Sequence, residues 1–345
     1  MKLLIVTQAV DSGDPVLGFF HRWLIEFAQH VESLTVICLY EGEHDLPENV
    51  QVYSLGKEHG ARSSVSYGWA FLKLVWRLRD SYDTVFVHMN PEYLVLAGPL
   101  WRMLGKRSVL WYMHKAVTWR LYLGVWWANA VCTASPQSMR IATRKKHVVG
   151  HGIIPFPQVP PPSYPPLALL TIGRLSRIKR VHVVIDTLDM LVRSGIDARL
   201  TIVGGAVTDD GRKYETELRD QVEGLGLVGR VVFAGPQPQA ALEEYFAAAH
   251  LFLHASDTGS LDKASLEPLS AGVPVITTDS ELAAVGIRAV MYAEPEPESF
   301  TGAVRKALGA RLWEHEEVRN EASRYIREHH ELTSLVPKIL VILGA

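Results

Sequence analysis

Short apolar runs alternate with longer amphipathic segments along the chain. Apolar runs that are brief and rich in β-branched residues predict strands, whereas apolar residues that recur every three or four positions predict helices. In the first half, this pattern predicts strands at 3–7, 34–39, 84–88, 108–113 and 130–133, and helices at 19–30, 65–78 and 93–104. Such alternation is typical of an α/β fold with a doubly wound parallel sheet.

A proline-rich segment then interrupts the pattern, with seven prolines among the twelve residues from Pro155 to Pro166. Proline at that density can neither continue a helix nor pair in a sheet, which indicates a domain boundary. Beyond it the alternation resumes, with strands at 168–172, 198–203, 231–234, 251–253 and 274–277, and helices at 181–194, 212–223, 239–248, 265–271 and 334–343. We therefore expect one domain at 1–160, a second of the same architecture at 161–330, and a ligand-binding cleft between their sheets.

Composition narrows the possible classes of function. The chain has 345 residues, 48% of them hydrophobic, with 35 Lys and Arg against 37 Asp and Glu. This balance, and the lack of a recognisable motif, argue against a nucleic-acid-binding protein. Cys38 and Cys132 lie in apolar contexts, which predicts buried free thiols and a reducing cytoplasm. No metal-ligand spacing is visible, and no apolar run reaches the roughly 18 residues of a membrane span.

Candidate binding chemistry begins where the strand at 168–172 ends. Gly173 and Arg174 follow this strand directly, and Lys179 comes five residues after the arginine, just before a helix. A permissive backbone, two long cations and the free amides of a helix start suit a diphosphate. The alternative is an ordinary solvated basic turn, because Arg177 and Arg180 lie in the same segment.

Several motifs of the second half resemble one enzyme family. They are TIGRLSRIKR at 171–180, LTIVGGA at 200–206, VVFAGPQP at 231–238 and LEPLSAGVPVI at 266–276. Together, in this order, they resemble glycosyltransferase family 4, whose members are retaining nucleotide-sugar transferases. The resemblance covers nearly all of 168–280. It implies a GT-B fold of two Rossmann-like domains, a nucleotide-sugar donor bound mainly by the second domain, and a helix at 331–345 that packs back on the first.

The resemblance also implies roles for individual residues in donor binding. Arg174 and Lys179 would hold the diphosphate, and Glu267 would accept the ribose hydroxyls of the nucleotide. Read from the sequence alone, Glu267 can instead be a first-turn glutamate that complements the helix dipole. The donor-binding set implied by the motifs is Gly173, Arg174, Lys179, Gly204, Lys263, Ser265, Leu266 and Glu267.

One position departs from the family pattern. The family has a first glutamate eight residues before the second, close to the transferred sugar, and this chain has Gly259 there. Asp257 or Asp262 can stand in for it, which makes both candidate catalytic residues. Lys263 replaces an apolar residue and can supply a third cation, or it can form a solvent-exposed pair with Asp262.

The first half contributes further candidates. His114 follows a predicted strand, and the resemblance gives it contact with the sugar or the acceptor as a catalytic residue. From sequence alone, a structural or surface histidine is the alternative. His88 is a second histidine that we expect near the cleft. Gly13 and Gly18 follow the first strand and resemble the family's loop near the donor phosphates.

Aromatic and basic residues are concentrated in the same part of the chain. Eight of the nine tryptophans lie within the first 127 residues, and residues 101–150 contain nine Lys or Arg and no Asp or Glu. Tryptophan and basic residues together favour a membrane interface. This pattern predicts a first domain that docks on the cytoplasmic face of a membrane, unless the tryptophans are core residues and the charges an ordinary solvated surface.

The sequence thus predicts a cytoplasmic retaining hexosyltransferase that can lie peripherally on the cytoplasmic face of a membrane. It would move a hexose from a nucleotide-diphosphate sugar to a glycan or lipid-linked acceptor in polysaccharide or glycolipid synthesis. We expect no cofactor beyond this co-substrate and no metal, because cations and helix amides can neutralise the leaving group. The alternatives are a nucleotide-sugar epimerase of the same fold and a non-catalytic protein that binds a sugar nucleotide or a partner transferase.

Overall fold

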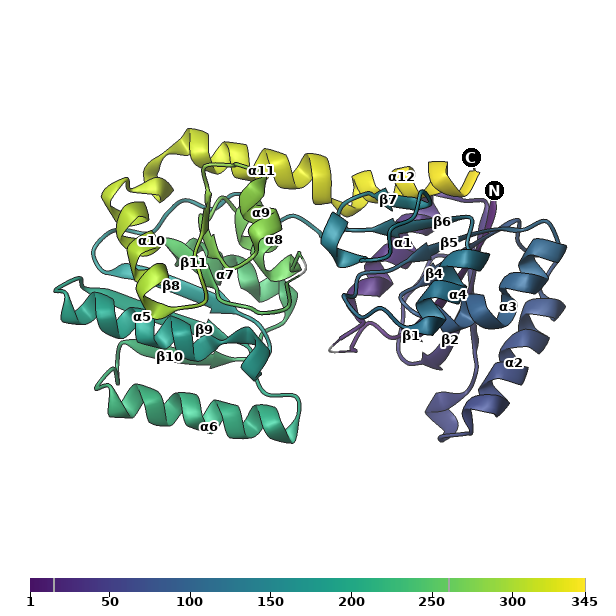
Figure 1. Ribbon diagram of the computed structural model, residues 1–345, viewed down its shortest axis with the longest axis horizontal. Helices are drawn as coiled ribbons and strands as arrows, with labels where there is room; N and C mark the ends of the chain where they lie inside the picture. The colour runs from purple at the N-terminus through teal and green to yellow at the C-terminus, as the bar shows by residue number, and fades with distance from the viewer. Residues whose placement is uncertain (15, 260, 345) are drawn as a thin grey trace. The chain divides into compact units, whose positions relative to one another are not determined.

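The chain folds into two compact units, each with its own parallel sheet (Figure 1). The computed structural model describes residues 1–14, 16–259 and 261–344. The first unit consists of Met1–Gly152 together with the chain from His329 onward, and the second unit is Ile153–Glu328. The sequence placed these divisions at 160 and 330. The first lies earlier in the structure because Phe156 and Val159, within the proline-rich segment, already belong to the core of the second unit.

In the described part of the first unit, seven parallel strands form a sheet with the order β3-β2-β1-β4-β5-β6-β7. The order runs outward in both directions from the pair β1 and β4, which is the arrangement of a dinucleotide-binding fold. The bounds are β1 (Lys2–Val10), β2 (Ser33–Glu41), β3 (Val50–Ser54), β4 (Thr84–His88), β5 (Arg107–Trp111), β6 (Ala130–Thr133) and β7 (Lys146–Val148).

Helices cover both faces of this sheet. Apolar side chains of α2, α3 and α4 share one buried cluster with one face of the sheet, and those of α1 and α12 share another cluster with the opposite face. The first unit is therefore doubly wound, as the sequence predicted. The bounds are α1 (Phe19–His30), α2 (Ser64–Arg77), α3 (Glu92–Met103), α4 (Trp119–Trp127) and α12 (Leu332–Gly344), with short 3-10 turns at Lys57–His59 and Pro136–Ser138.

His88 belongs to this core and does not line an accessible site, so the expectation for it was wrong. Its imidazole is 2% exposed and stacks on Phe20, with 3.8 Å between the ring centroids. Its Nδ1 and the Thr7 hydroxyl are 3.1 Å apart. Burial lowers the pKa of His88 to about 3, so the ring is neutral at physiological pH. Cys38 and Cys132 are buried free thiols, as predicted.

The second unit repeats the architecture. Its described residues form a parallel sheet of six strands in the order β10-β9-β8-β11-β12-β13, again with a reversal at its centre, between β8 and β11. The bounds are β8 (Leu167–Ile172), β9 (Ala198–Val203), β10 (Val231–Gly235), β11 (Leu251–His254), β12 (Val275–Thr277) and β13 (Val290–Tyr292).

The two faces of this sheet are covered by separate groups of helices. One buried cluster contains α5, α6 and α10, and the other contains α7, α8, α9 and α11. The bounds are α5 (Val181–Arg193), α6 (Asp209–Gly224), α7 (Leu242–Ala247), α8 (Lys263–Ser270), α9 (Ser280–Ala284), α10 (Pro297–Gly309) and α11 (Glu316–His330), with 3-10 turns at Arg177–Lys179, Gln239–Ala241 and Leu312–Glu314. Across the described ranges of both units, no helix is long and apolar enough to cross a membrane.

Candidate functional site

The predicted donor-binding residues of the second unit gather at the reversal of strand order between β8 and β11. In open α/β sheets, ligands bind at the carboxyl ends of the strands at such a reversal. The loop after β8 (173–180) and the start of the loop after β11 (255–259) meet there, because the backbone amide of Asp257 donates to the carbonyl of Ile178 at 2.8 Å. Two loops that are far apart in sequence thereby form one edge.

Glycines keep this edge free of side chains. Gly204 has φ +127°, and a Cβ atom placed there would lie 2.0 Å from the carbonyl oxygen of Gly173. Gly173 has φ +155° and donates its amide to the carbonyl of Val203 at 2.9 Å. The ends of β8 and β9 therefore approach so closely that only glycine fits at position 204.

Lys179 is held in a buried ion pair at the centre of the edge. Its ammonium pairs with the carboxylate of Asp262, and both side chains are largely buried. The same carboxylate lies 3.4 Å from Nε2 of His254, whose Nδ1 is 3.0 Å from the hydroxyl of Thr277. In the tautomer with its proton on Nε2, His254 donates to Asp262 and accepts from Thr277.

Electrostatics keep Asp262 ionised. Burial alone would raise the pKa of its carboxyl, but the hydrogen bond from His254 and the positive charge of Lys179 outweigh this and hold the pKa well below its usual range. The other oxygen of Asp262 accepts the backbone amide of Ala264 at 3.1 Å and so caps the N-terminus of α8. One carboxylate thus connects β11, the loop after β8 and the start of α8.

Glu267 lies one turn into α8 and is buried without a partner. Its exposed fraction is 6%, and its carboxylate has no hydrogen-bond or ion-pair partner within the described ranges of the chain. Burial raises the pKa of Glu267 to about 7, although the charge of Lys263 partly opposes this. Ser265, on the same helix, is fully buried, and its hydroxyl also has no partner among the described residues. Leu266 between them belongs to the core.

The structure separates the four cations of the loop after β8. Arg177 forms hydrogen bonds of 2.6 and 2.8 Å with Glu217, and Arg180 pairs with Asp257 at 2.7 Å. Lys179 forms an ion pair with Asp262. Arg174 is exposed, and none of the residues that the structure describes pairs with it. Of these cations, Arg174 is therefore the one available to a ligand without exchange of a protein partner.

Neither aspartate near Gly259 is an unengaged carboxylate. Asp257 lies on an exposed loop and pairs with Arg180, whereas Asp262 is buried in its contacts with Lys179 and His254. Gly259 itself has φ +56°, in the left-handed region that favours glycine. A glutamate at this position would therefore require a strained backbone.

The remaining candidates, His114, Gly13 and Gly18, belong to the first unit. His114 lies three residues beyond β5, is exposed, and accepts the backbone amide of Ala116 on Nδ1 at 3.1 Å. Its Nε2 is the ring nitrogen that this contact leaves available.

Gly13 and Gly18 lie in the loop after β1. Gly18 precedes α1, and a Cβ atom there would lie 2.6 Å from the carbonyl oxygen of Asp14. The carboxylate of Asp14 accepts the backbone amides of Val16 at 2.8 Å and Leu17 at 2.7 Å. The protein's own anion thus occupies two of the amides that this loop could offer to a phosphate.

Sequence reasoning missed two members of the site, His254 and Thr277. His254 is the last residue of β11 and Thr277 the last residue of β12, and the two strands are adjacent. A histidine at the carboxyl end of an apolar strand was the available signal. Among the described residues, no group of three or more His, Cys, Asp or Glu side chains is arranged to hold a metal ion.

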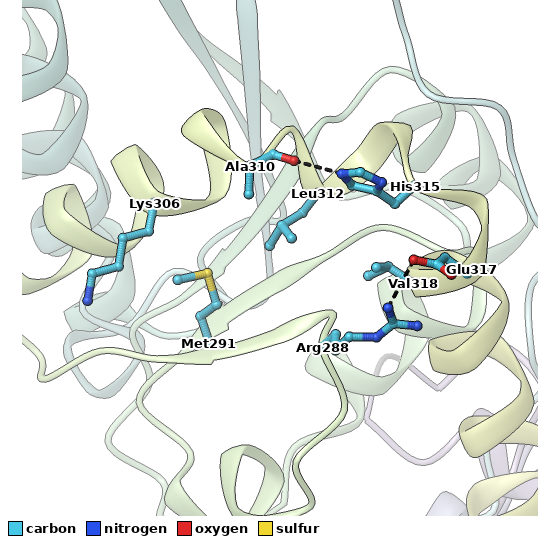
Figure 2. Close-up of a pocket in the computed structure, with 8 residues that line it drawn as sticks. All are labelled: Arg288, Met291, Lys306, Ala310, Leu312, His315, Glu317 and Val318. Atoms are coloured by element: carbon cyan, nitrogen blue, oxygen red, sulfur yellow. Dashed lines mark hydrogen bonds and ion pairs between the residues drawn. The ribbon is translucent and has the colours of Figure 1, made fainter.

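The second unit also has a hollow that is lined by other residues than the predicted donor-binding set. It has a volume of about 530 Å³ and lies between β13, α10 and α11 (Figure 2). Its Arg288 pairs with Glu317 at 3.0 Å, and His315 contacts the carbonyl of Ala310 at 2.9 Å. None of the predicted donor-binding residues lines this hollow, so it is distinct from the edge at β8 and β11.

Solved structures share the fold over the whole chain. A structure of HepE from Anabaena in complex with UDP aligns over 100% of both chains with a TM-score of 0.78 and 18% identity. The lipopolysaccharide outer core galactosyltransferase WaaB, in its apo form, aligns over 100% of both chains with a TM-score of 0.75 and 16% identity. The GT-B fold predicted from the sequence is thereby confirmed.

Curated relatives match shorter parts. Mannosylfructose-phosphate synthase of Agrobacterium fabrum is 28% identical over 112 residues, which is 32% of this chain and 25% of the relative. D-inositol 3-phosphate glycosyltransferase of Gordonia bronchialis is 29% identical over 145 residues, 40% of this chain and 31% of the relative. The matches therefore span about a quarter to a third of the length of these relatives.

A family model matches the second unit almost from end to end. Residues 158–329 match the model described as glycosyl transferases group 1. This region contains β8 to β13 and all the donor-binding residues predicted from the sequence. Through it, the chain belongs to the group 1 glycosyl transferases.

Proposed function

We propose that this protein transfers a hexose from a nucleotide-diphosphate sugar to a hydroxyl group of a glycan or lipid-linked acceptor, with retention of configuration and without a metal. The observation that carries the proposal is the buried, unpartnered carboxylate of Glu267. A carboxylate is rarely left buried without a partner, because its desolvation is costly. Two vicinal ribose hydroxyls would supply the donors that the protein itself does not.

The cations of the same edge support a diphosphate. Arg174 is exposed and unpaired among the described residues, and Lys179 is connected to α8 through Asp262. A planar guanidinium and an ammonium can neutralise the charge that develops on a leaving diphosphate. The names of the two curated relatives, a synthase of a sugar phosphate conjugate and a glycosyltransferase, are in keeping with this chemistry.

The proposed transfer breaks the bond between the anomeric carbon and the diphosphate oxygen. The acceptor oxygen forms its bond on the same face of the sugar, and its proton passes to the departing diphosphate. Arg174 and Lys179 stabilise the diphosphate charge, and no protein nucleophile is needed. We assign donor binding to the second unit, and acceptor binding to the first unit, where Nε2 of His114 would contact a sugar or acceptor hydroxyl and Gly13 and Gly18 would shape the loop after β1.

The pairing of both aspartates favours keeping one alternative. Asp257 and Asp262 are engaged by Arg180 and by Lys179, so neither stands free in place of the glutamate missing at Gly259. A protein that binds a sugar nucleotide without transferring the sugar fits this arrangement. An epimerase of the same fold would act on the donor with no acceptor present.

A thermal-shift panel of UDP-, GDP- and ADP-sugars tests donor binding, because a ligand of the folded state raises the unfolding temperature. The stabilising donor is then incubated alone and with a panel of glycan and lipid-linked acceptors, and the products are analysed. Transfer that needs an acceptor supports the proposal, and conversion of the donor alone supports the epimerase. Tight binding without turnover supports the non-catalytic protein, and no stabilisation by any donor contradicts all three.

A further inference from the structure

Two helices of the first unit, α2 and α4, present exposed aromatic side chains. On α4, Trp119, Tyr122, Leu123 and Trp126 are all exposed, and their spacing of three and four residues places them on one stripe of the helix. On α2, Val65, Trp69 and Trp76 are exposed with similar spacing. Large apolar side chains gathered in this way on a protein surface usually mark a binding site.

Trp69 of α2 and Trp119 of α4 line the same groove, which connects the stripes. Trp69 is 72% exposed and Trp119 is 63% exposed. The groove has a volume of about 640 Å³, and Leu96 of α3 and the aliphatic Val65 and Leu72 of α2 contribute to its wall. Its charged residues, Arg120 and Glu92, lie 3.5 Å apart and so offset one another. We call this surface, defined by Val65, Trp69, Trp76, Leu96, Trp119, Tyr122 and Trp126, the aromatic face.

The chain segments that carry the aromatic face contain more Lys and Arg than Asp and Glu. The α2 segment, residues 61–79, contains Arg62, Lys73, Arg77 and Arg79 and no acidic residue. Residues 99–146, which include the C-terminal end of α3 and all of α4, contain nine Lys or Arg and again no acidic residue. The nearby acids are few, and two of them, Asp80 and Glu92, pair with Arg79 and Arg120.

Cations and rings are also in direct contact. The guanidinium of Arg79 lies 4.7 Å from the ring centre of Trp76, and that of Arg120 lies 5.4 Å from the ring centre of Trp119. Indole rings concentrate at the interface of a bilayer, where an apolar body and a polar edge are both accommodated. Basic residues beside them are attracted to anionic headgroups close to the surface.

We propose that the aromatic face docks on the surface of an anionic phospholipid membrane, with the indole rings at the headgroup level and the surrounding Lys and Arg against the lipid phosphates. A protein partner with an acidic surface is the competing occupant, but the exposed tryptophans of α2 and α4, together with the excess of Lys and Arg in the same segments, favour a bilayer. The inference is independent of the transfer reaction, since membrane binding requires neither donor nor acceptor.

Co-sedimentation of the full chain with phosphatidylcholine vesicles, with and without phosphatidylglycerol, tests the proposal. We expect binding to the anionic vesicles that weakens as salt is raised, because salt screens the attraction. The double variant Trp69→Ser, Trp119→Ser should lose about tenfold or more in partitioning, since two large apolar side chains no longer enter the interface. Tyr292→Ser, at an exposed aromatic of the second unit, is the matched control and should bind like the wild type.

A charge variant separates lipid binding from a defect in folding. Lys73 is exposed on α2, and Lys73→Glu should weaken binding to anionic vesicles by about fivefold or more. Lys213→Glu, on α6 of the second unit, should leave it unchanged. Equal binding of wild type and the tryptophan variant would overturn the proposal, and so would failure of the wild type to bind either vesicle. Self-association that depends on Trp69 and Trp119 would assign the aromatic face to a protein contact instead.

Discussion

Lys179 forms an ion pair with Asp262, the residue that caps helix α8. This pair determines how a diphosphate can enter the site. A ligand that takes the ammonium of Lys179 must compete with a carboxylate that His254 also holds in place. Arg174 needs no such exchange, so we expect the two cations to contribute differently to donor binding.

Asp262→Asn should destabilise the folded protein. Asparagine can still cap α8, but it leaves the buried ammonium of Lys179 without its counter-charge, at a cost of about 2 kcal/mol or more. Urea denaturation at neutral pH measures the loss. Asp257→Asn is the control, because its pair with Arg180 is solvent-exposed and should be worth less than about 1 kcal/mol. Equal losses in the two variants would show that the buried pair of Asp262 and Lys179 stabilises the fold no more than the exposed pair of Asp257 and Arg180.

The depressed pKa of Asp262 also predicts an acid dependence. The folded protein binds this proton less readily than the unfolded chain, so the free energy of unfolding should fall as pH drops through and below the usual value of 3.8. Asp262→Asn should lack this part of the decline. Comparison of the two proteins in urea titrations over the acid range provides the test, and parallel curves would contradict it.

Arg174→Ala should weaken donor binding by about tenfold or more without loss of stability, because charged hydrogen bonds to a ligand are worth roughly 1.5 to 3 kcal/mol. Arg177→Ala is the matched control in the same loop, since Arg177 is engaged by Glu217. Titration calorimetry with the nucleotide sugar selected by the thermal-shift panel measures both. Transfer activity should disappear in Arg174→Ala and in Lys179→Ala, and full activity in both variants would contradict the proposed function.

Glu267 predicts a pH dependence of donor binding. Its pKa is about 7 in the free protein, and ribose hydroxyls that donate to the carboxylate favour its ionised form. Below pH 7, binding should therefore release a proton, and affinity should rise with pH by up to about tenfold per unit. Calorimetry in two buffers with different ionisation enthalpies detects the released proton. Glu267→Gln should bind more weakly and with no proton release, and an unchanged release would exclude Glu267 as its source.

The same residue affects stability with the opposite sign to Asp262. The pKa of Glu267 is raised from its usual 4.5, so the folded protein binds the proton more tightly than the unfolded chain. Its contribution to the free energy of unfolding is complete below pH 4.5 and is lost as pH rises toward 7, by at most about 1.4 kcal/mol per unit. Glu267→Gln should remove this decline, which urea titrations near the two ends of that range can measure.

Gly204→Ala should be among the most damaging single changes in the second unit. The added methyl would lie 2.0 Å from the carbonyl oxygen of Gly173, and φ is +127°. We expect a loss of about 3 kcal/mol or more in the free energy of unfolding. Gly195→Ala is the control, since its φ is +85° but nothing lies within 4 Å of the added atom, and it should cost about 1 kcal/mol. Similar losses in the two variants would show that the backbone shifts enough to separate the added methyl from the carbonyl oxygen of Gly173.

Most central strands and their neighbouring helices could be predicted from the sequence, because buried parallel strands are short apolar runs. Helix α4 was missed for a physical reason. Its outer stripe of Trp119, Tyr122 and Trp126 is as apolar as its buried side, represented by Leu121 and Val125, so no amphipathic pattern marks it. The edge strands β3 and β7 were also missed, because they are short and flanked by polar residues and so give no clear apolar run.

For the site, the sequence supplied the residues but not their pairing. Gly173, Arg174, Lys179 and Glu267 were placed at strand and helix ends by local signals, and the structure positions them there. That Lys179 pairs with Asp262, and Arg180 with Asp257, depends on contacts between residues about eighty positions apart. The pattern of a single sequence does not show which distant residues are in contact. For the same reason, the contact between His254 and Asp262 could not be predicted.

The position of α12 has a consequence for the order in which the protein acquires its structure during synthesis. Leu335, Val336 and Ile339 complete the core beneath α1, although every strand of both sheets has been made before them. A nascent chain that has reached residue 328 contains the whole second unit, while the first unit still lacks α12, which shares the covering of one sheet face with α1. The core of the N-terminal unit can therefore be completed only after the whole of the second unit has been synthesised.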